Sequence, residues 1–285
     1  MDNELIKNIH VINLDRSQDR LKLFDENMKK YNLNYKRFKA VDGKKLNLKD
    51  IKKSTTNMCR SILCNRSIIG CALSHILLWK QISESTDKWH FIIEDDIHLN
   101  DKALPYLDKL KKEILNEDDI IISLQCTGPL CFGGKSKFSQ LHKPVFPLGT
   151  CAYLITKNTA KKLYDYFKIN KINYHLDNQM AFNISSLNIK RYTTSNNVII
   201  NTGDNNSTVS NNSLWIMGNV LNKLGLSNIN WMFSVPILTI DMQYTINFYM
   251  VLFVILLLLN IFVFNSILLY IYLLLEFTLS FIIKF

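Results

Sequence analysis

The segment Gly70–Asn100 constrains the fold most, because a helical pattern in it is followed by a short apolar run and three consecutive acids. The run Trp89–Ile93 is rich in aromatic and β-branched residues and too short for a helix, so it predicts a buried strand. Glu94, Asp95 and Asp96 follow it directly. Acids at the carboxyl end of a strand in an open α/β sheet border the ligand crevice. The segment therefore predicts an α/β fold with an acidic site at one edge of its sheet.

The three acids allow two interpretations. Adjacent carboxylates repel one another and raise at least one pKa unless a positive group binds between them. A hard divalent cation that also binds phosphate oxygens supplies that charge, and its expected ligands are Asp96 and Glu94. The alternative is a solvated acidic loop that follows a strand and binds nothing.

A helix is expected upstream of the acidic strand, beginning near Gly70. One stripe of its surface is formed by Ala72, His75, Ile76 and Trp79. This spacing is typical of a helix that lies on a sheet, so we expect the helix to pack beside the strand that carries the acids.

The amino-terminal segment offers a second group of candidate site residues. A buried strand is predicted over Ile9–Leu14 and a helix over Gln18–Tyr31. Arg16 and Arg20 then fall at the start of this helix, near the carboxyl end of the first strand. Helix N–H groups and guanidinium groups there favour a diphosphate, and Asn13 would contact a base or ribose. The alternative is structural: a nearby acid caps the helix, and the arginines form surface ion pairs.

Apolar runs and helical patterns alternate along the rest of the first 200 residues. Further strands are expected at 35–41, 120–125 and 149–156, and further helices at 101–115, 158–167 and 179–187. The segment 126–147 contains the densest group of Gly and Pro residues, so it is expected to be a loop that acts as a lid over a bound ligand. This alternation predicts an α/β domain.

Four motifs together resemble glycosyltransferase family 25. They are INLDRSQDR at 12–20, AVDG at 40–43, GCALSH at 70–75 with the apolar strand and EDD after it, and GTCAYLIT at 149–156. Their order and intervals are similar to those of that family, which includes bacterial lipooligosaccharide galactosyltransferases and animal procollagen galactosyltransferases.

The resemblance implies a Rossmann-like, GT-A-type domain that binds a nucleotide sugar. It further implies UDP-galactose or a related UDP-hexose as the donor, Mn²⁺ as the cofactor, and inversion at the anomeric carbon. The residues expected to bind the donor are Asn13, Arg16, Arg20, Glu94 and Asp95, and those expected to bind the metal are Glu94 and Asp96.

Asp177 also has two interpretations. Its position before the helical pattern at 179–187 is that of a helix N-cap. In the resembled family an acid at this place is a candidate catalytic base, and inversion needs one base opposite the leaving group. Both interpretations remain open.

Charge and cysteine content limit the function classes. The 34 Lys and Arg against 24 Asp and Glu leave a net charge of +10, which suits nucleic acid, an anionic membrane surface or a phosphate-bearing donor. The lysines are spread along the chain and are not interleaved with aromatic residues, so a nucleic-acid partner is not expected. The six cysteines form no CxxC pair and no zinc-ligand spacing, which favours free thiols in a reducing compartment.

The carboxyl-terminal segment differs from the rest of the chain. Residues 246–283 form an apolar run whose single charged residue is Glu276. One helix of this length would extend about 57 Å, nearly twice the hydrocarbon thickness of about 30 Å. Two transmembrane helices that turn at Asn265–Ser266 fit better, with Glu276 facing the partner helix or an interface. A single tilted span and a helix buried against the head are the alternatives.

The combined prediction is a metal-dependent, inverting glycosyltransferase domain over residues 1–213, an interfacial linker over 214–245 and a transmembrane hairpin over 246–285. The acceptor would be a glycan, lipid-linked or protein hydroxyl group. A basic head without a signal-peptide layout is expected on the cytoplasmic face of the membrane, with the lumenal face as the alternative. Competing hypotheses are a catalytically silent membrane-anchored scaffold and a metal-dependent phosphohydrolase. The second is disfavoured because no set of ligands for two metals stands out.

Overall fold

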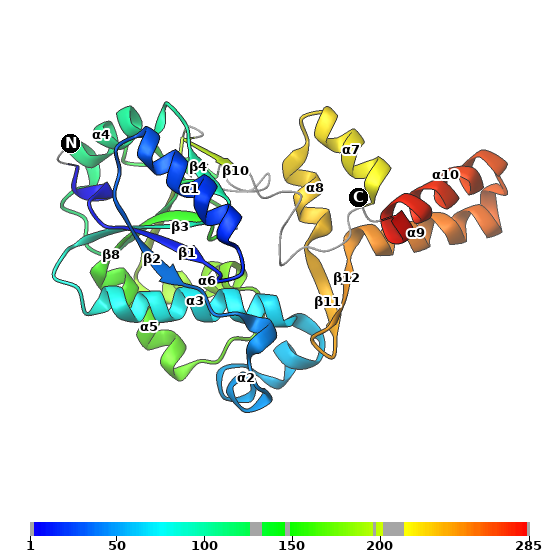
Figure 1. Ribbon diagram of the computed structural model, residues 1–285, viewed down its shortest axis with the longest axis horizontal. Helices are drawn as coiled ribbons and strands as arrows, with labels where there is room; N and C mark the ends of the chain where they lie inside the picture. Colours follow the sequence, from blue (N-terminus) through cyan, green and yellow to red (C-terminus); the bar gives the residue numbers. More distant parts are fainter. Residues whose placement is uncertain (1–2, 126–132, 146–148, 196–197, 202–213, 284–285) are drawn as a thin grey trace. The chain divides into compact units, whose positions relative to one another are not determined.

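A computed structural model describes residues 3–125, 133–145, 149–195, 198–201 and 214–283 (Figure 1). The chain divides into two compact units. One comprises residues 1–59 and 66–204, and the other comprises residues 60–65 and 205–285. The first unit therefore contains every residue that the sequence proposes for the site.

A mixed sheet forms the centre of the first unit (Figure 1). Its strands are β1 (Ile9–Asn13), β2 (Tyr35–Lys39), β3 (Trp89–Glu94), β5 (Ile120–Ser123), β6 (Gly134–Lys135), β7 (Leu141–Lys143), β8 (Ala152–Thr156) and β9 (Lys190–Thr194). Over the described residues their order is β2-β1-β3-β8-β5-β9-β7-β6. β1 runs parallel to β2 and β3, and β5 runs parallel to β9, whereas β8 lies antiparallel between β3 and β5. The α/β class expected from the sequence is confirmed.

Helices pack on both faces of this sheet. On one face, α1 (Gln18–Lys30) and α4 (Ala103–Ile114) share a buried apolar core with β1, β3 and β5. On the other face, α3 (Arg66–Ser83) packs against α5 (Lys157–Ile169), with α6 (Leu176–Asn183) nearby. A short helix, α2 (Leu48–Ser54), precedes α3, and a small antiparallel pair is formed by β4 (Ile97–Leu99) and β10 (Ile199–Asn201).

The elements predicted from periodicity agree closely with the structure. All five residues of β1 are buried, as its continuous apolar pattern predicts. α3 begins at Arg66, four residues before the expected Gly70, and its predicted stripe is buried. The helical spacing therefore identified the face of α3 that lies on the sheet.

The prediction of a lid loop over 126–147 is wrong for its described part. Residues 133–145 contain β6 and β7, and β7 pairs with β9 in the main sheet. Sheet pairing satisfies backbone N–H and C=O groups that a free loop would leave to water. The remaining positions of the expected lid, 126–132 and 146–147, lie outside the described residues.

Two glycines allow α3 to approach the segment after β2 closely. A Cβ atom on Gly70 would lie 2.6 Å from both the Gly43 nitrogen and the Val41 carbonyl oxygen. The Val41 N–H donates to Ser74 Oγ at 2.8 Å, which joins the same two segments. The AVDG and GCALSH motifs are thus two sides of one packing contact, with Asp42 capping the short 3₁₀ turn that follows.

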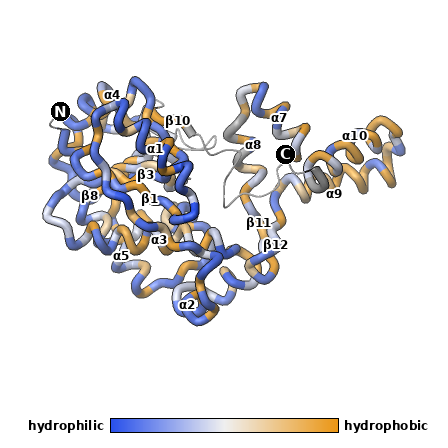
Figure 2. The backbone as a smooth tube through the Cα atoms, in the orientation of Figure 1, coloured by the Kyte–Doolittle hydropathy of each residue, from blue (hydrophilic) through white to orange (hydrophobic). Residues whose placement is uncertain are grey.

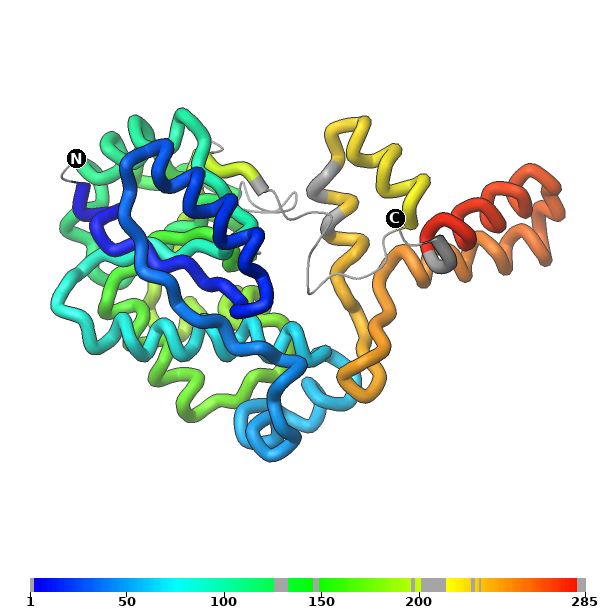
Figure 3. Tube along the Cα trace, in the orientation of Figure 1, coloured from blue at the N-terminus to red at the C-terminus, as the bar shows by residue number. Residues whose placement is uncertain are grey.

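The second unit comprises residues 60–65 and 205–285. It contains α7 (Trp215–Lys223), α8 (Ser227–Ser234), the hairpin of β11 (Pro236–Ile240) and β12 (Tyr244–Asn247), and the helices α9 (Phe248–Leu259) and α10 (Ile267–Phe277). The chain turns between α9 and α10 at Asn265, which has a positive φ of 45°, and at Ser266, which caps α10. α9 and α10 run side by side and are strongly hydrophobic (Figures 2 and 3).

The predicted transmembrane hairpin is not supported. In the described part of the chain, no helix combines the length and the apolar character that crossing a bilayer requires. The expected turn at Asn265–Ser266 is present, but α9 ends at Leu259 and continues only as a π-helical turn. Glu276 is buried within its unit, where it accepts hydrogen bonds from the backbone N–H groups of Ile216 at 2.8 Å and Met217 at 3.3 Å. Residues 214–245, expected as a linker, form α7, α8 and the β11–β12 hairpin.

The expectation of free thiols holds for only some of the cysteines. Cys71 and Cys151 are free, whereas Cys59 and Cys64 are disulfide-bonded. Cys126 and Cys131 lie outside the described residues. The spacing between positions 59 and 64 is longer than a CxxC pair and is not a zinc-ligand spacing, so neither pattern predicts this bonding.

Candidate functional site

β1 and β3 end side by side, and this brings together the polar residues at their carboxyl ends. The two strands are parallel, with Ile12 opposite Glu94. Asn13 and Asp95 are therefore neighbours, and Asn13 Nδ2 donates a hydrogen bond of 2.6 Å to Asp95 Oδ2. Asp95 is buried although it carries a carboxyl group. The acids thus lie at the carboxyl ends of the parallel strands, where the sequence predicts them.

Arg20 contacts two of the three acids from the first turn of α1. Its Nε atom lies 3.2 Å from Asp95 Oδ1, and its Nη2 atom forms a second ion pair with Asp96. The Arg20 side chain is 22% exposed. The alternative of an isolated surface ion pair is therefore wrong for Arg20, because its partners are the predicted site acids themselves.

The pKa values of Asp95 and Asp96 are both raised. Burial is the largest cause for each carboxyl group, and for Asp96 the next cause is repulsion by Glu94. Together these effects raise the pKa of Asp96 to about 7, although Arg20 acts in the opposite direction. A solvated acidic loop would not produce this burial, so the structure argues against the simpler interpretation of the three acids.

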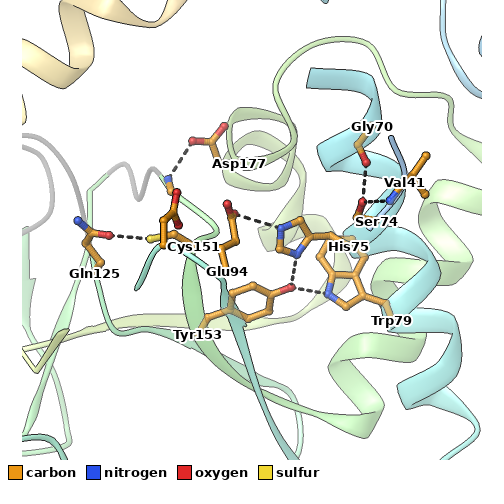
Figure 4. A network of polar contacts seen from close by, with 12 residues as sticks. Val41, Gly70, Ser74, His75, Trp79, Glu94, Gln125, Cys151, Tyr153 and Asp177 are labelled. Atoms are coloured by element: carbon orange, nitrogen blue, oxygen red, sulfur yellow. Dashed lines mark hydrogen bonds and ion pairs between the residues drawn. The ribbon is translucent and has the colours of Figure 1, made fainter. Parts of the chain in front are cut away.

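Glu94 faces α3 on the other side of the site (Figure 4). Its Oε1 atom lies 3.5 Å from His75 Nε2. His75 Nδ1 is 2.9 Å from the Tyr153 hydroxyl group, which also accepts a hydrogen bond of 2.9 Å from Trp79 Nε1. The residues His75 and Trp79, which periodicity marks as a packing stripe, therefore also form a buried polar network that ends at Glu94.

Arg16 lies on the far side of the first strand's end. It forms an ion pair with Asp42, which follows β2, and its side chain is 38% exposed. Arg37, which sequence reasoning missed, donates from Nε to Asn13 Oδ1 at 2.8 Å and from Nη2 to Asp15 Oδ1 at 2.8 Å. Arg37 is adjacent to β1 only because β2 pairs with it in this register. No local pattern in the sequence predicts the contact between Arg37 and Asn13.

Asp177 lies within the first turn of α6, whose N-cap is His175. The N-cap interpretation is therefore wrong by two residues. Asp177 Oδ2 accepts a hydrogen bond of 2.9 Å from the Gly149 N–H (Figure 4). Asp177 Oδ1 accepts one of 2.8 Å from the Asn178 N–H. The pKa of the Cys71 thiol is raised by burial, then by Glu94 and then by Asp177. The α6 helix, which carries Asp177, contacts α3.

Two further polar side chains of this region were missed by sequence reasoning. Cys71 lies one helical turn before His75, and among the described residues Cys71, His75 and Glu94 are the one group of three whose ligand atoms all lie within 4.8 Å of one another. Asp96, the expected metal ligand, is not part of that group. Arg191 on β9 is buried, and its Nε and Nη1 atoms have no partner in the described part of the chain. The spacing of Cys71 and His75 was visible in the sequence, whereas nothing distinguished Arg191.

Comparison with known proteins decides the family. Residues 6–180 match glycosyltransferase family 25, which is described as a family of LPS biosynthesis proteins. The chain belongs to glycosyltransferase family 25. The match includes all the predicted site residues, from Asn13 to Asp177, and the resemblance drawn from four short motifs is confirmed.

Relatives in family 25 come from bacteria and animals. A putative glycosyltransferase of Haemophilus influenzae is 29% identical over 175 residues, which cover 59% of this chain and 60% of that protein. Human procollagen galactosyltransferase 2 is 27% identical over 174 residues, covering 54% of this chain and 27% of that protein. A lipooligosaccharide biosynthesis protein of H. influenzae is 27% identical over 122 residues, covering 39% and 40%.

The chain thus spans at most about three fifths of each of these family 25 relatives. The region shared with the H. influenzae glycosyltransferase and the procollagen enzyme has the size of the first unit's sheet domain. The substrates of those longer proteins are therefore only proposals for this chain.

Proposed function

We propose that this family 25 domain is a metal-dependent, inverting glycosyltransferase that moves a hexose from a UDP-sugar to a hydroxyl group of a glycan, lipid-linked or protein acceptor. Galactose is the hexose that the name of the procollagen relative favours. The observation that carries the proposal is the cluster of Asp95, Asp96 and Arg20 beside Asn13, where the parallel strands β1 and β3 end. Ligands of α/β sheets bind at such an edge.

Arg20 and Arg16 are the proposed diphosphate ligands. Both lie at the amino-terminal end of α1, where unpaired backbone N–H groups and the helix dipole favour an anion. Arg20 already neutralises part of the charge of Asp95 and Asp96, so its guanidinium would stand between these acids and the phosphates. The Asn13 amide is held by Arg37 and Asp95, and it is the proposed contact to the ribose or base of the donor.

The donor set fits a hard divalent cation. Glu94 and Asp96 offer carboxylate oxygens, the ligand type that Mn²⁺ and Mg²⁺ prefer. Arg20 pairs with Asp95 and Asp96, yet the pKa of Asp96 is raised to about 7 because burial and Glu94 outweigh Arg20. A bound Mn²⁺ would neutralise the negative charge that develops on the departing diphosphate. Asp96 would be its main ligand, with Glu94 in support.

Asp177 is the proposed base that takes the proton of the acceptor hydroxyl group. Its two backbone hydrogen bonds fix the orientation of the carboxylate. It lies on the α3 side of the sheet with Glu94, whereas Arg20 reaches the acids from α1. Inversion requires a base on the face of the anomeric carbon opposite the leaving group, and Asp177 is proposed for that role.

A donor screen tests the proposal. Purified full-length protein is incubated with Mn²⁺ and a panel of UDP-hexoses, and UDP release is measured with and without glycan, lipid-linked and peptide acceptors. We expect release with one UDP-hexose, and faster release with one acceptor class. No Mn²⁺-dependent turnover or UDP binding would favour a silent scaffold, and hydrolysis that no acceptor diverts into transfer would favour a phosphohydrolase.

The proposal includes a location beside a membrane surface. The net charge of +10 favours a surface rich in anionic lipid, where a membrane-made acceptor would be found. We propose that the domain acts on the cytoplasmic side. Protease treatment of sealed vesicles that carry the protein with tags at both ends tests this, because protection of the amino-terminal tag in right-side-out microsomes would place the domain in the lumen.

A further inference from the structure

A thiol, an imidazole and a carboxylate converge on the α3 side of the site, apart from the ion pairs of Arg20. They belong to Cys71 and His75 on α3 and to Glu94 at the end of β3, and their ligand atoms all lie within 4.8 Å of one another. We propose that Cys71, His75 and Glu94 bind a borderline-soft divalent cation of the Zn²⁺ class. Glu94 is also a supporting ligand of the proposed Mn²⁺ site, but binding of the softer ion to Cys71 and His75 does not require sugar transfer.

The distance between His75 and Glu94 fits two ligands of one ion better than a hydrogen bond. His75 Nε2 lies 3.5 Å from Glu94 Oε1, and this buried nitrogen has no hydrogen-bond partner among the residues that the structure describes. N–H···O hydrogen bonds are typically about 2.7–3.2 Å long. Zinc bonds of about 2.0–2.1 Å at a tetrahedral angle place a nitrogen and an oxygen ligand about 3.4 Å apart. The pair is therefore already spaced for shared coordination.

Cys71 completes the group because of its position on α3. Residues four apart on a helix lie on the same face, so Cys71 and His75 point the same way. The Cys71 thiol is free, and its side chain is only partly buried, as is that of Glu94, so an ion can reach them from solvent. A thiolate and an imidazole select Zn²⁺ or Co²⁺ over Mg²⁺ and Mn²⁺, which prefer oxygen ligands.

The contacts behind His75 are those of a metal-bound imidazole. A ligating histidine normally donates its second ring N–H to a neighbouring oxygen, and Nδ1 lies 2.9 Å from the Tyr153 hydroxyl group (Figure 4). The Trp79 N–H fixes the same hydroxyl group from the other side. Without metal the hydroxyl group can donate to Nδ1 instead, so this contact serves both states. Three protein ligands leave a fourth position open, as in catalytic rather than structural zinc sites.

Cobalt titration of the metal-depleted full chain tests the site. Thiolate ligation of Co²⁺ produces a sulfur-to-metal charge-transfer absorption, which Zn²⁺ bleaches when it displaces Co²⁺. We expect this absorption to saturate at one equivalent in the wild type and to be lost in Cys71→Ser. Cys151→Ser is the matched control, because Cys151 is the other free cysteine of the described site and donates to Gln125 Oε1 at 2.7 Å instead. It should retain the absorption.

Two results would overturn the proposal: no charge-transfer absorption in the wild type, or an unchanged absorption in Cys71→Ser. Circular dichroism and thermal melting check that Cys71→Ser is folded. Asp96→Asn separates this site from the proposed Mn²⁺ site, because it should lose Mn²⁺-dependent UDP binding and keep the cobalt absorption. Loss of that absorption in Asp96→Asn would mean that Asp96 and Cys71 bind the same ion and would overturn the assignment of a separate site. Normal UDP binding in Asp96→Asn would contradict only the proposed function.

Discussion

Asn13 donates a hydrogen bond of 2.6 Å to Asp95, from which it is separated by 82 positions in the chain. The oxygen of the same amide accepts a hydrogen bond of 2.8 Å from Arg37. A chain of polar contacts thus crosses β2, β1 and the end of β3 at their common edge. Asp95 is the most buried of the three acids, because its side chain is 7% exposed whereas those of Asp96 and Glu94 are 18% and 30% exposed.

Replacement of Asp96 by Asn should weaken Mn²⁺-dependent UDP binding more than tenfold. The substitution removes a charged oxygen ligand at nearly constant volume, so the fold should be retained. Isothermal titration with UDP, with and without Mn²⁺, measures the effect. Asp101→Asn is the control, since that side chain is 80% exposed and pairs with Lys30 on the surface. Equal affinities in wild type and Asp96→Asn would remove Asp96 from the metal site.

Replacement of Arg20 by Ala should raise the donor KM roughly tenfold and lower kcat less. Hydrogen bonds to charged groups contribute about 1.5–3 kcal/mol, and loss of binding that is equal in ground and transition states appears in KM. Steady-state kinetics over a range of donor concentrations separates the two constants. Lys29→Ala on the same helix is the control, because Lys29 is 75% exposed and pairs with Asp25. Wild-type kinetics in Arg20→Ala would make its ion pairs purely structural.

The raised pKa of Asp96 predicts a pH effect on the stability of the metal-free protein. The folded state keeps this proton up to about pH 7, whereas the unfolded carboxyl group ionises near its usual value of 3.8. Between these values the folded state binds more protons, so the contribution of Asp96 to the free energy of unfolding falls as pH rises. His10, whose pKa burial lowers to about 4, acts in the opposite sense.

The comparison that isolates Asp96 is therefore wild type against Asp96→Asn. Urea unfolding from pH 4 to pH 8 should show the variant gaining stability relative to the wild type as pH rises. Mn²⁺ should stabilise the wild type at pH 8 and should stabilise the variant less. Parallel pH curves for the two proteins would show that the Asp96 carboxyl group titrates normally in the folded state.

Replacement of Gly70 by Ala should destabilise the first unit by about 1–3 kcal/mol, because the new methyl group overpacks a closed contact. Its Cβ atom would lie 2.6 Å from the Gly43 nitrogen and 2.6 Å from the Val41 carbonyl oxygen. Gly134→Ala is the matched control, since a Cβ atom there meets nothing within 4 Å. Urea unfolding followed by tryptophan fluorescence compares the two. Equal midpoints would mean that the AVDG–GCALSH contact tolerates a side chain.

Local patterns were sufficient for much of the first unit. The continuous apolar run of β1 and the stripe of α3 depend on which residues are buried, and burial leaves a period in the sequence. The position of Glu94, Asp95 and Asp96 after a strand could be predicted because the buried strand before them leaves an apolar run in the sequence. Family 25 was also readable, because its four motifs lie in order along the chain.

The partners of these residues depended on the tertiary structure. The insertion of antiparallel β8 between β3 and β5 brings Tyr153 to His75, and the pairing of β2 with β1 brings Arg37 to Asn13. Arg20 turned out to neutralise the acids, and Asp177 proved to lie inside α6 rather than at its cap. The apolar tail indicated two helices that turn at Asn265–Ser266, but the end of α9 at Leu259, where a π-helical turn follows, appeared only in the structure. The periodicity of apolar residues indicates which face of a helix or strand is buried. Strand order and side-chain pairing, in contrast, follow from packing between segments far apart in the chain.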